Sequence, residues 1–216
     1  MDFVIAVDGA AASGKGTLAA LLAADYGLPH LDTGLLYRAV GCAVLAARGD
    51  PSSAADAEAT VRALDTSRLD DPALQTGPAG EAASQAAAHP GVRRALFDLQ
   101  REFALRPGGA VLDGRDIGTV IAPEAPAKLF VDAALEVRAR RRWLQVQAKG
   151  DTRPLAAMVD ALARRDARDA GRADAPMIRA ADAVLLDTTD LSISQSADAA
   201  RRIVEEARRR WEEHRS

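Results

Sequence analysis

The sequence predicts an α/β fold in which helices flank a five-stranded parallel sheet. Five short apolar segments have the length and aliphatic content of buried parallel strands. Helical patterns lie between them, and strands that alternate with helices form right-handed βαβ units with helices on both faces of the sheet. A glycine-rich stretch directly after the first strand adds a site to this fold.

The first predicted strand, residues 3–7, leads into the stretch GAAASGKGT and then into an Ala/Leu-rich helix over residues 15–26. This order forms a phosphate-binding loop (P-loop), because glycines let backbone N–H groups approach an anion and the helix N-terminus favours negative charge. Lys15 adds a point charge. We therefore predict binding of a nucleoside triphosphate, against the alternative of a chance glycine turn. The predicted loop comprises Gly9, Ala10, Ala11, Ala12, Ser13, Gly14, Lys15, Gly16 and Thr17.

The other predicted strands cover residues 28–31, 110–112, 128–131 and 183–186, and the other predicted helices cover residues 34–48, 92–105, 135–149, 154–170 and 192–211. An aspartate lies at or just past the end of every strand. Ligands of parallel sheets bind at the carboxyl ends of the strands, although helix capping or turn formation is the alternative role for some of these residues. The five aspartates are Asp8, Asp32, Asp113, Asp132 and Asp187.

The 216 residues suit a single domain, with a core formed by residues 1–48, 91–149 and 177–216. Residues 49–90 are rich in Ala, Asp, Ser, Pro and Gly, contain no convincing strand, and are expected to form an inserted segment with helices over residues 54–64 and 81–88. Residues 150–176 have the pattern of a mobile flap.

Composition restricts the possible partners. The net charge of −3 does not indicate a general nucleic-acid surface, and no apolar run approaches the ~20 residues of a membrane span. The N-terminus has no basic region or cleavage site of an export signal. Cys42 is the only cysteine, which excludes an internal disulfide and fits a reducing compartment. We expect a cytoplasmic protein, a monomer, that binds small molecules.

Four segments combine arginine with acidic or aromatic residues: residues 32–38 (DTGLLYR), 113–119 (DGRDIGT), 138–142 (RARRR) and 164–172 (RRDARDAGR). Phosphoryl transfer depends on positioning and on neutralising phosphate charge, so a nucleotide kinase needs a P-loop and several convergent arginines. Each segment alone could be a capped or salt-bridged helix face. Together with the P-loop, they favour phosphate handling.

The segments GAAASGKGT, LDTGLLYR, EAASQAAAHPGVR, LDGRDIGTVIAPEAPAKLFVDA and RRDARDAGRADAP occur in this order over nearly the whole chain. This combination resembles the bacterial cytidylate kinases, a family of P-loop nucleoside monophosphate kinases. The DGRDIGTV and RDxRDxxR blocks distinguish it from adenylate, shikimate and dephospho-coenzyme A kinases. The resemblance implies a P-loop kinase core with a small acceptor-binding insertion (about 49–90) and a lid (about 150–176). The implied reaction transfers the γ-phosphate of ATP to CMP or dCMP with Mg²⁺, a step of pyrimidine nucleotide metabolism.

The resemblance also implies roles for individual residues. On the donor side, the P-loop would hold the ATP phosphates, Thr17 would lie near the metal, and the implied catalytic residues are Lys15, Arg115, Arg138 and Arg141, with Arg142 beside them. On the acceptor side, Tyr37, Arg38 and Arg115 would lie near the CMP phosphate, and Arg165 and Asp169 near the sugar. Cytosine presents an amino donor beside two acceptors, which suits the remaining set of Ser84, Arg93, Asp116 and Arg172.

Three departures from the family pattern stand out. Ala10, Ala11 and Ala12 replace a usual proline and glycine, which predicts a slightly stiffer loop. Thr33 replaces a common serine and keeps the substrate-side hydroxyl. The segment of residues 65–81 is shorter than the matching insert in many relatives and lacks their alternating strand pattern. The small sheet expected in the insertion is therefore reduced or absent.

Three other functions are compatible with a P-loop. A kinase for UMP or for a non-nucleotide acceptor fits the same P-loop. A GTP-binding switch reads guanine with an Asn-Lys-x-Asp element, but this chain has no asparagine. A non-catalytic relative of the kinases is disfavoured because Lys15 and the arginine segments are retained.

Overall fold

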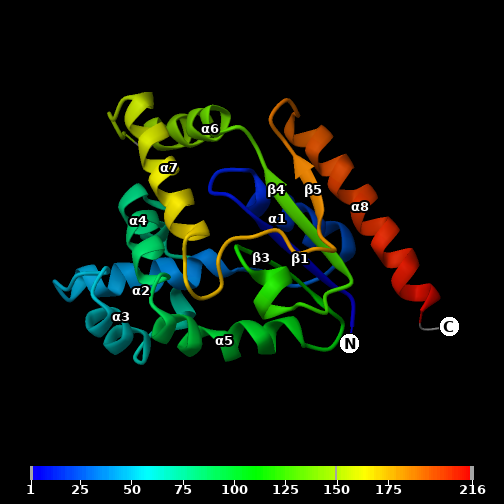
Figure 1. The fold of residues 1–216 in the computed structure, drawn as a ribbon, viewed down its shortest axis with the longest axis horizontal. Helices are drawn as coiled ribbons and strands as arrows, with labels where there is room; N and C mark the ends of the chain where they lie inside the picture. The colour runs from blue at the N-terminus through cyan, green and yellow to red at the C-terminus, as the bar shows by residue number, and fades with distance from the viewer. Residues whose placement is uncertain (1, 149, 215–216) are drawn as a thin grey trace.

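The computed structural model describes residues 2–148 and 150–214. Its five strands form one parallel sheet, as predicted, and their order in the sheet is β2-β3-β1-β4-β5 (Figure 1). Most strands run one or two residues past the predicted ends and so include the terminal aspartates. The strands are β1 (Val4–Gly9), β2 (His30–Asp32), β3 (Ala110–Gly114), β4 (Ala127–Asp132) and β5 (Val184–Asp187).

Successive side chains of β1 point to opposite faces of the sheet, and this explains the two layers of the core. Val4 and Ala6 face one side of the sheet and pack with residues of α2 and α5, whereas Ile5 and Val7 face the other side and pack with α1 and α8. All four side chains are fully buried. The helices on the two faces are α1 (Lys15–Tyr26), α2 (Thr33–Ala46), α5 (Pro90–Ala104) and α8 (Ile193–Glu213).

The inserted segment, residues 49–90, contains α3 (Ala54–Val61), α4 (Gly77–Ala86) and two 3₁₀ turns, η1 (Thr66–Arg68) and η2 (Pro72–Gln75), and no strand. The expected loss of the small sheet is therefore confirmed. The segment packs against the core through α2 and α4, which approach closely at Gly41. A Cβ at this position would lie 2.7 Å from the Cβ of Ala82, so only glycine permits this approach.

Helix α6 (Leu135–Gln147) packs against α7 (Leu155–Ala170) through a small hydrophobic cluster. Its buried members are Ala139 and Val146 of α6, Met158 and Leu162 of α7, and Ala11 of the P-loop. Figure 1 shows the two helices side by side beyond the carboxyl end of β4. The predicted end of α6 at Lys149 lies outside the described residues. None of the helices in the described ranges is long and apolar enough to cross a membrane.

Besides the two 3₁₀ turns of the inserted segment, the sequence does not predict a π-helical turn over Ile117–Ile121 (η3) after β3. Its first N–H groups are taken by a residue of another strand, because Asp8 accepts hydrogen bonds from Ile117 N (2.8 Å) and Gly118 N (2.7 Å). A wide turn of this kind is common at functional sites. It fixes the chain immediately after Asp116.

Candidate active site

A cavity of about 510 Å³ lies at the carboxyl ends of the strands. The P-loop lines one part of it, and the rest is lined by residues of α2, α4, α5, α6 and α7, of the β3–η3 turn, and of the segment from β5 into α8. The predicted P-loop and substrate residues thus meet in one space. The cavity has the volume of a small-molecule site and adjoins a helix N-terminus.

The P-loop takes its shape from three residues with positive φ. Gly9 (φ 145°) ends β1, and a Cβ there would overlap the carbonyl oxygen of Val131. Gly14 (φ 94°) caps α1, and Ala12 (φ 60°) adopts a conformation that costs a non-glycine residue about 1–2 kcal/mol. Gly9 and Ala10 lie behind the cavity, whereas the seven residues from Ala11 to Thr17 line it.

Lys15 lies at the start of α1 and faces the cavity. Burial, together with the positive charge of Arg115, lowers its pKa to about 8. Among the described residues, no carboxylate forms an ion pair with it. A half-buried ammonium without a carboxylate partner is suited to an anionic ligand.

Several arginines converge on the middle of the cavity. Arg165, on α7, has a pKa lowered to about 9 by burial and by the charge of Arg115. Arg38, on α2, has a pKa lowered by burial and by Arg142, and it donates to the carbonyl oxygens of Leu74 (2.7 Å) and Thr76 (3.1 Å). Mutual repulsion of these cations favours a ligand that brings negative charge.

A polar pocket, defined here as Ser84, Arg93, Asp116, Asp169 and Arg172, forms part of the cavity. Arg93 and Asp116 form a buried ion pair. Burial raises the pKa of Asp116 against the lowering effect of Arg93 and Arg172. Tyr37 lies beside this pocket, with its ring centroid 5.7 Å from the Arg93 guanidinium carbon.

Asp169 organises the other members of this pocket. Ser84 Oγ donates to its Oδ1 (2.8 Å), Arg172 Nη2 donates to the same oxygen (2.6 Å), and Arg115 Nε donates to its Oδ2 (2.9 Å). Burial raises its pKa, but the nearby arginines outweigh burial and bring the pKa to about 2. The ionised carboxylate thus ties α7 to α4 and to the β3–η3 turn.

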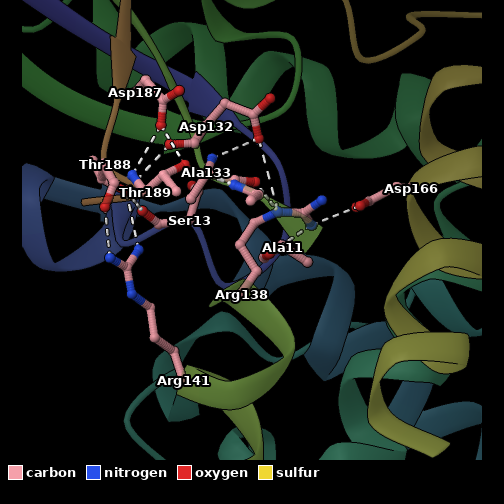
Figure 2. A network of polar contacts seen from close by, with 11 residues as sticks. Ala11, Ser13, Asp132, Ala133, Arg138, Arg141, Asp166, Asp187, Thr188 and Thr189 are labelled. Atoms are coloured by element: carbon pink, nitrogen blue, oxygen red, sulfur yellow. Dashed lines mark hydrogen bonds and ion pairs between the residues drawn. The ribbon is translucent and has the colours of Figure 1, made fainter. Parts of the chain in front are cut away.

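The arginines of α6 have different surroundings (Figure 2). Arg141 lines the cavity and donates to Thr188 Oγ1 (3.0 Å) and to the Thr188 carbonyl (2.6 Å). Arg138 does not line it, because its guanidinium is buried and donates to Ala133 O (2.7 Å), Ala11 O (3.2 Å) and Asp166 Oδ2 (2.6 Å). In this conformation its donors serve protein acceptors.

The carboxylates of Asp32 and Asp113, at the ends of β2 and β3, also line the cavity. The sequence predicts only their position at the strand ends. Burial and Asp113 raise the pKa of Asp32. Asp113 Oδ1 lies 2.8 Å from His30 Nε2, and its carbonyl accepts from Thr33 Oγ1 (2.8 Å). The described residues contain no cluster of three or more metal-binding side chains. Two carboxylates in the same cavity as Thr17 still suit Mg²⁺, which takes its other ligands from phosphates and water.

The sequence analysis does not predict the cavity-lining residues that follow β5. They are Thr188, Leu191, Ser192, Ile193 and Ser196. Their only sequence signal is their position directly after the last strand, at the ligand-binding edge of a parallel sheet.

A parallel sheet with a P-loop after β1, a cationic middle and a polar pocket beyond it defines the class of P-loop nucleoside monophosphate kinases. Comparison with known proteins specifies the family. The family model for cytidylate kinase matches residues 5–209. The chain therefore belongs to the cytidylate kinase family.

Similar proteins include a cytidylate kinase of Caulobacter sp. (strain K31), 62% identical over 211 residues that cover 98% of each chain. A cytidylate kinase of Xanthobacter autotrophicus (strain ATCC BAA-1158 / Py2) is 58% identical over 205 residues, covering 95% of this chain and 98% of that one. An uncharacterized protein from Eubacterium ventriosum ATCC 27560, of known crystal structure, shares the fold with a TM-score of 0.53 and 13% identity, covering 96% of this chain and 98% of that one.

Proposed function

We propose that this chain transfers the γ-phosphate of ATP to CMP or dCMP and releases ADP and CDP or dCDP. The observation that carries the proposal is one cavity shared by the P-loop, Lys15, a cluster of arginines and the polar pocket. Phosphoryl transfer requires two nucleotides held with their phosphates together and their charge neutralised. Membership of the cytidylate kinase family supports the choice of substrate.

On the donor side, the residues from Ala11 to Thr17 bind the ATP phosphates with backbone N–H groups. Lys15 neutralises charge on the group in transfer, and Arg141 extends the cationic wall from α6. Thr17, Asp32 and Asp113 line the same cavity and would hold Mg²⁺, which would supply neutralisation of phosphate charge when bound.

On the acceptor side, Arg38 and Arg115 bind the CMP phosphate, and Arg165 and Asp169 lie near the sugar. Asp116 accepts the amino group of cytosine, while Arg93, Arg172 and Ser84 donate to the ring acceptors. Residues 49–90 act as the acceptor-binding insertion and residues 150–176 as the lid. We also propose a monomeric, cytoplasmic enzyme.

Substrate choice is tested by steady-state release of ADP with CMP, dCMP, UMP and AMP as acceptors. We expect CMP or dCMP to have a kcat/KM at least tenfold above that of UMP, because a buried pocket rejects a base whose donors and acceptors are exchanged. AMP should be inactive. Preference for UMP or AMP would reject the proposed function.

A further inference from the structure

Two carbonyl groups of the P-loop are held by side chains from outside the loop (Figure 2). Thr188 Oγ1, after β5, donates to the carbonyl of Ser13 at 2.9 Å, and the carbonyl of Asp132 is a second, longer acceptor at 3.2 Å. Arg138 Nη1, on α6, donates to the carbonyl of Ala11 at 3.2 Å. The two donor residues are only 2% and 7% exposed, so water competes little for these bonds.

Both donor residues are themselves fixed. Arg141 donates to the hydroxyl and the carbonyl of Thr188, whose N–H donates to Asp132 O at 2.8 Å. Arg138 is held by Ala133 O and by the carboxylate of Asp166. A side chain with several fixed partners gives the group that it binds one defined orientation.

The direction of these carbonyls determines the direction of the next N–H groups. In a trans peptide the C=O and the following N–H point to opposite sides. With the carbonyls of Ala11 and Ser13 turned to Arg138 and Thr188, the N–H groups of Ala12 and Gly14 point the other way. Both residues line the cavity, and within residues 2–148 and 150–214 no acceptor takes either N–H.

We propose that Thr188 and Arg138 are positioning residues of the phosphoryl-donor site. They fix two peptide groups of the P-loop so that its N–H donors face the phosphates before a nucleotide arrives. The inference rests on the proposed function, which puts ATP in this cavity. Donors fixed in advance bind an anion more tightly than donors that must reorient.

The test replaces Thr188 in two ways and measures ADP binding by calorimetry and KM for ATP and CMP. Thr188→Val keeps the shape of the side chain but removes the donor. It should raise the Kd for ADP and the KM for ATP about tenfold, the effect of one lost hydrogen bond, with KM for CMP within twofold. Thr188→Ser keeps the hydroxyl and should restore ADP binding to within about threefold of the unmodified enzyme.

The matched control is Thr60→Val, which removes a similar hydroxyl-to-carbonyl bond (to Asp56 O, 2.8 Å) on α3 and should change none of these values. Arg138→Lys keeps the charge but cannot reach three acceptors at once, so it should reproduce the donor-side defect. Stronger ADP binding by the Val variant than by the Ser variant, or equal rises in KM for ATP and CMP, would overturn the proposal. If the unmodified chain bound ADP but did not phosphorylate CMP, the proposed function would fail, while ADP binding would still decide the positioning role.

Discussion

Lys15 connects stability with function at the scale of one residue. Its pKa falls from 10.5 to about 8 on folding, so the charged side chain costs the folded state free energy at pH 7. This cost is complete below pH 8 and disappears as the pH rises towards 10.5. Lys15, which we propose binds phosphate, is therefore charged at the expense of stability.

We predict that Lys15→Met lowers kcat at least 100-fold and raises the free energy of unfolding of the unliganded protein at pH 7. Loss of an electrostatic donor in the transition state costs roughly 3–4 kcal/mol, whereas removal of the buried charge gains about 1–3 kcal/mol. Thermal denaturation at pH 7 and pH 10 measures the second effect, which should be smaller at pH 10. The control is Arg94→Met, an exposed cation on α5 that lies outside the cavity. A variant that melts below the unmodified protein at pH 7 would contradict the pKa argument.

Substitution of Asp116 tests the proposed basis of the selectivity for cytosine over uracil. Asp116→Asn should lower kcat/KM for CMP and narrow the CMP/UMP ratio, because an amide can turn to either base whereas a carboxylate accepts only from the cytosine amino group. The lost discrimination should be about 10- to 150-fold, since an unmatched buried polar partner costs ~1–3 kcal/mol. Kinetics of the variant with both nucleotides measure it. An equal loss with both bases would mean that Asp116 serves only to hold Arg93 in their ion pair.

At the scale of elements, α7 brings Arg165 and Asp169 into the cavity, where Arg165 Nε lies 3.8 Å from Asp169 Oδ2, and it brings Asp166 to the buried Arg138. Arg165 lies close to the positive charges of Arg115 and Arg38, so we expect closure of the proposed lid to depend on negative charge from a ligand. We predict that residues 150–176 exchange amide hydrogens rapidly in the unliganded protein. Protection should increase when ADP and CMP are both bound. Equal protection in the two states would contradict the assignment of a lid.

The elements themselves were largely predictable, because aliphatic segments and glycine turns are local signals. The strand order and the π-helical turn were not. That turn depends on Asp8, which lies 109 residues before Ile117 in the chain and accepts its N–H in the folded state. The buried position of Arg138 likewise depends on α6 packing between the P-loop and α7, although its sequence surroundings match those of a phosphate-binding arginine.

At the scale of the whole molecule, the strand-end aspartates of β2 and β3 come into register as neighbours, as do those of β4 and β5. The parallel arrangement thus brings donor and acceptor residues to one edge of the sheet from segments as distant as the P-loop and α7. The residue types predicted most of this set. The contacts that orient it come from tertiary packing and needed the structure.

The most direct test of the central claim is the transfer of label from γ-labelled ATP in the presence of CMP. If one cavity holds both nucleotides, the label should appear in the β-phosphate of CDP, with little free phosphate. Lys15→Met should abolish the transfer. Label that appeared as free phosphate while CMP stayed unmodified, or transfer to UMP in preference to CMP, would contradict the account.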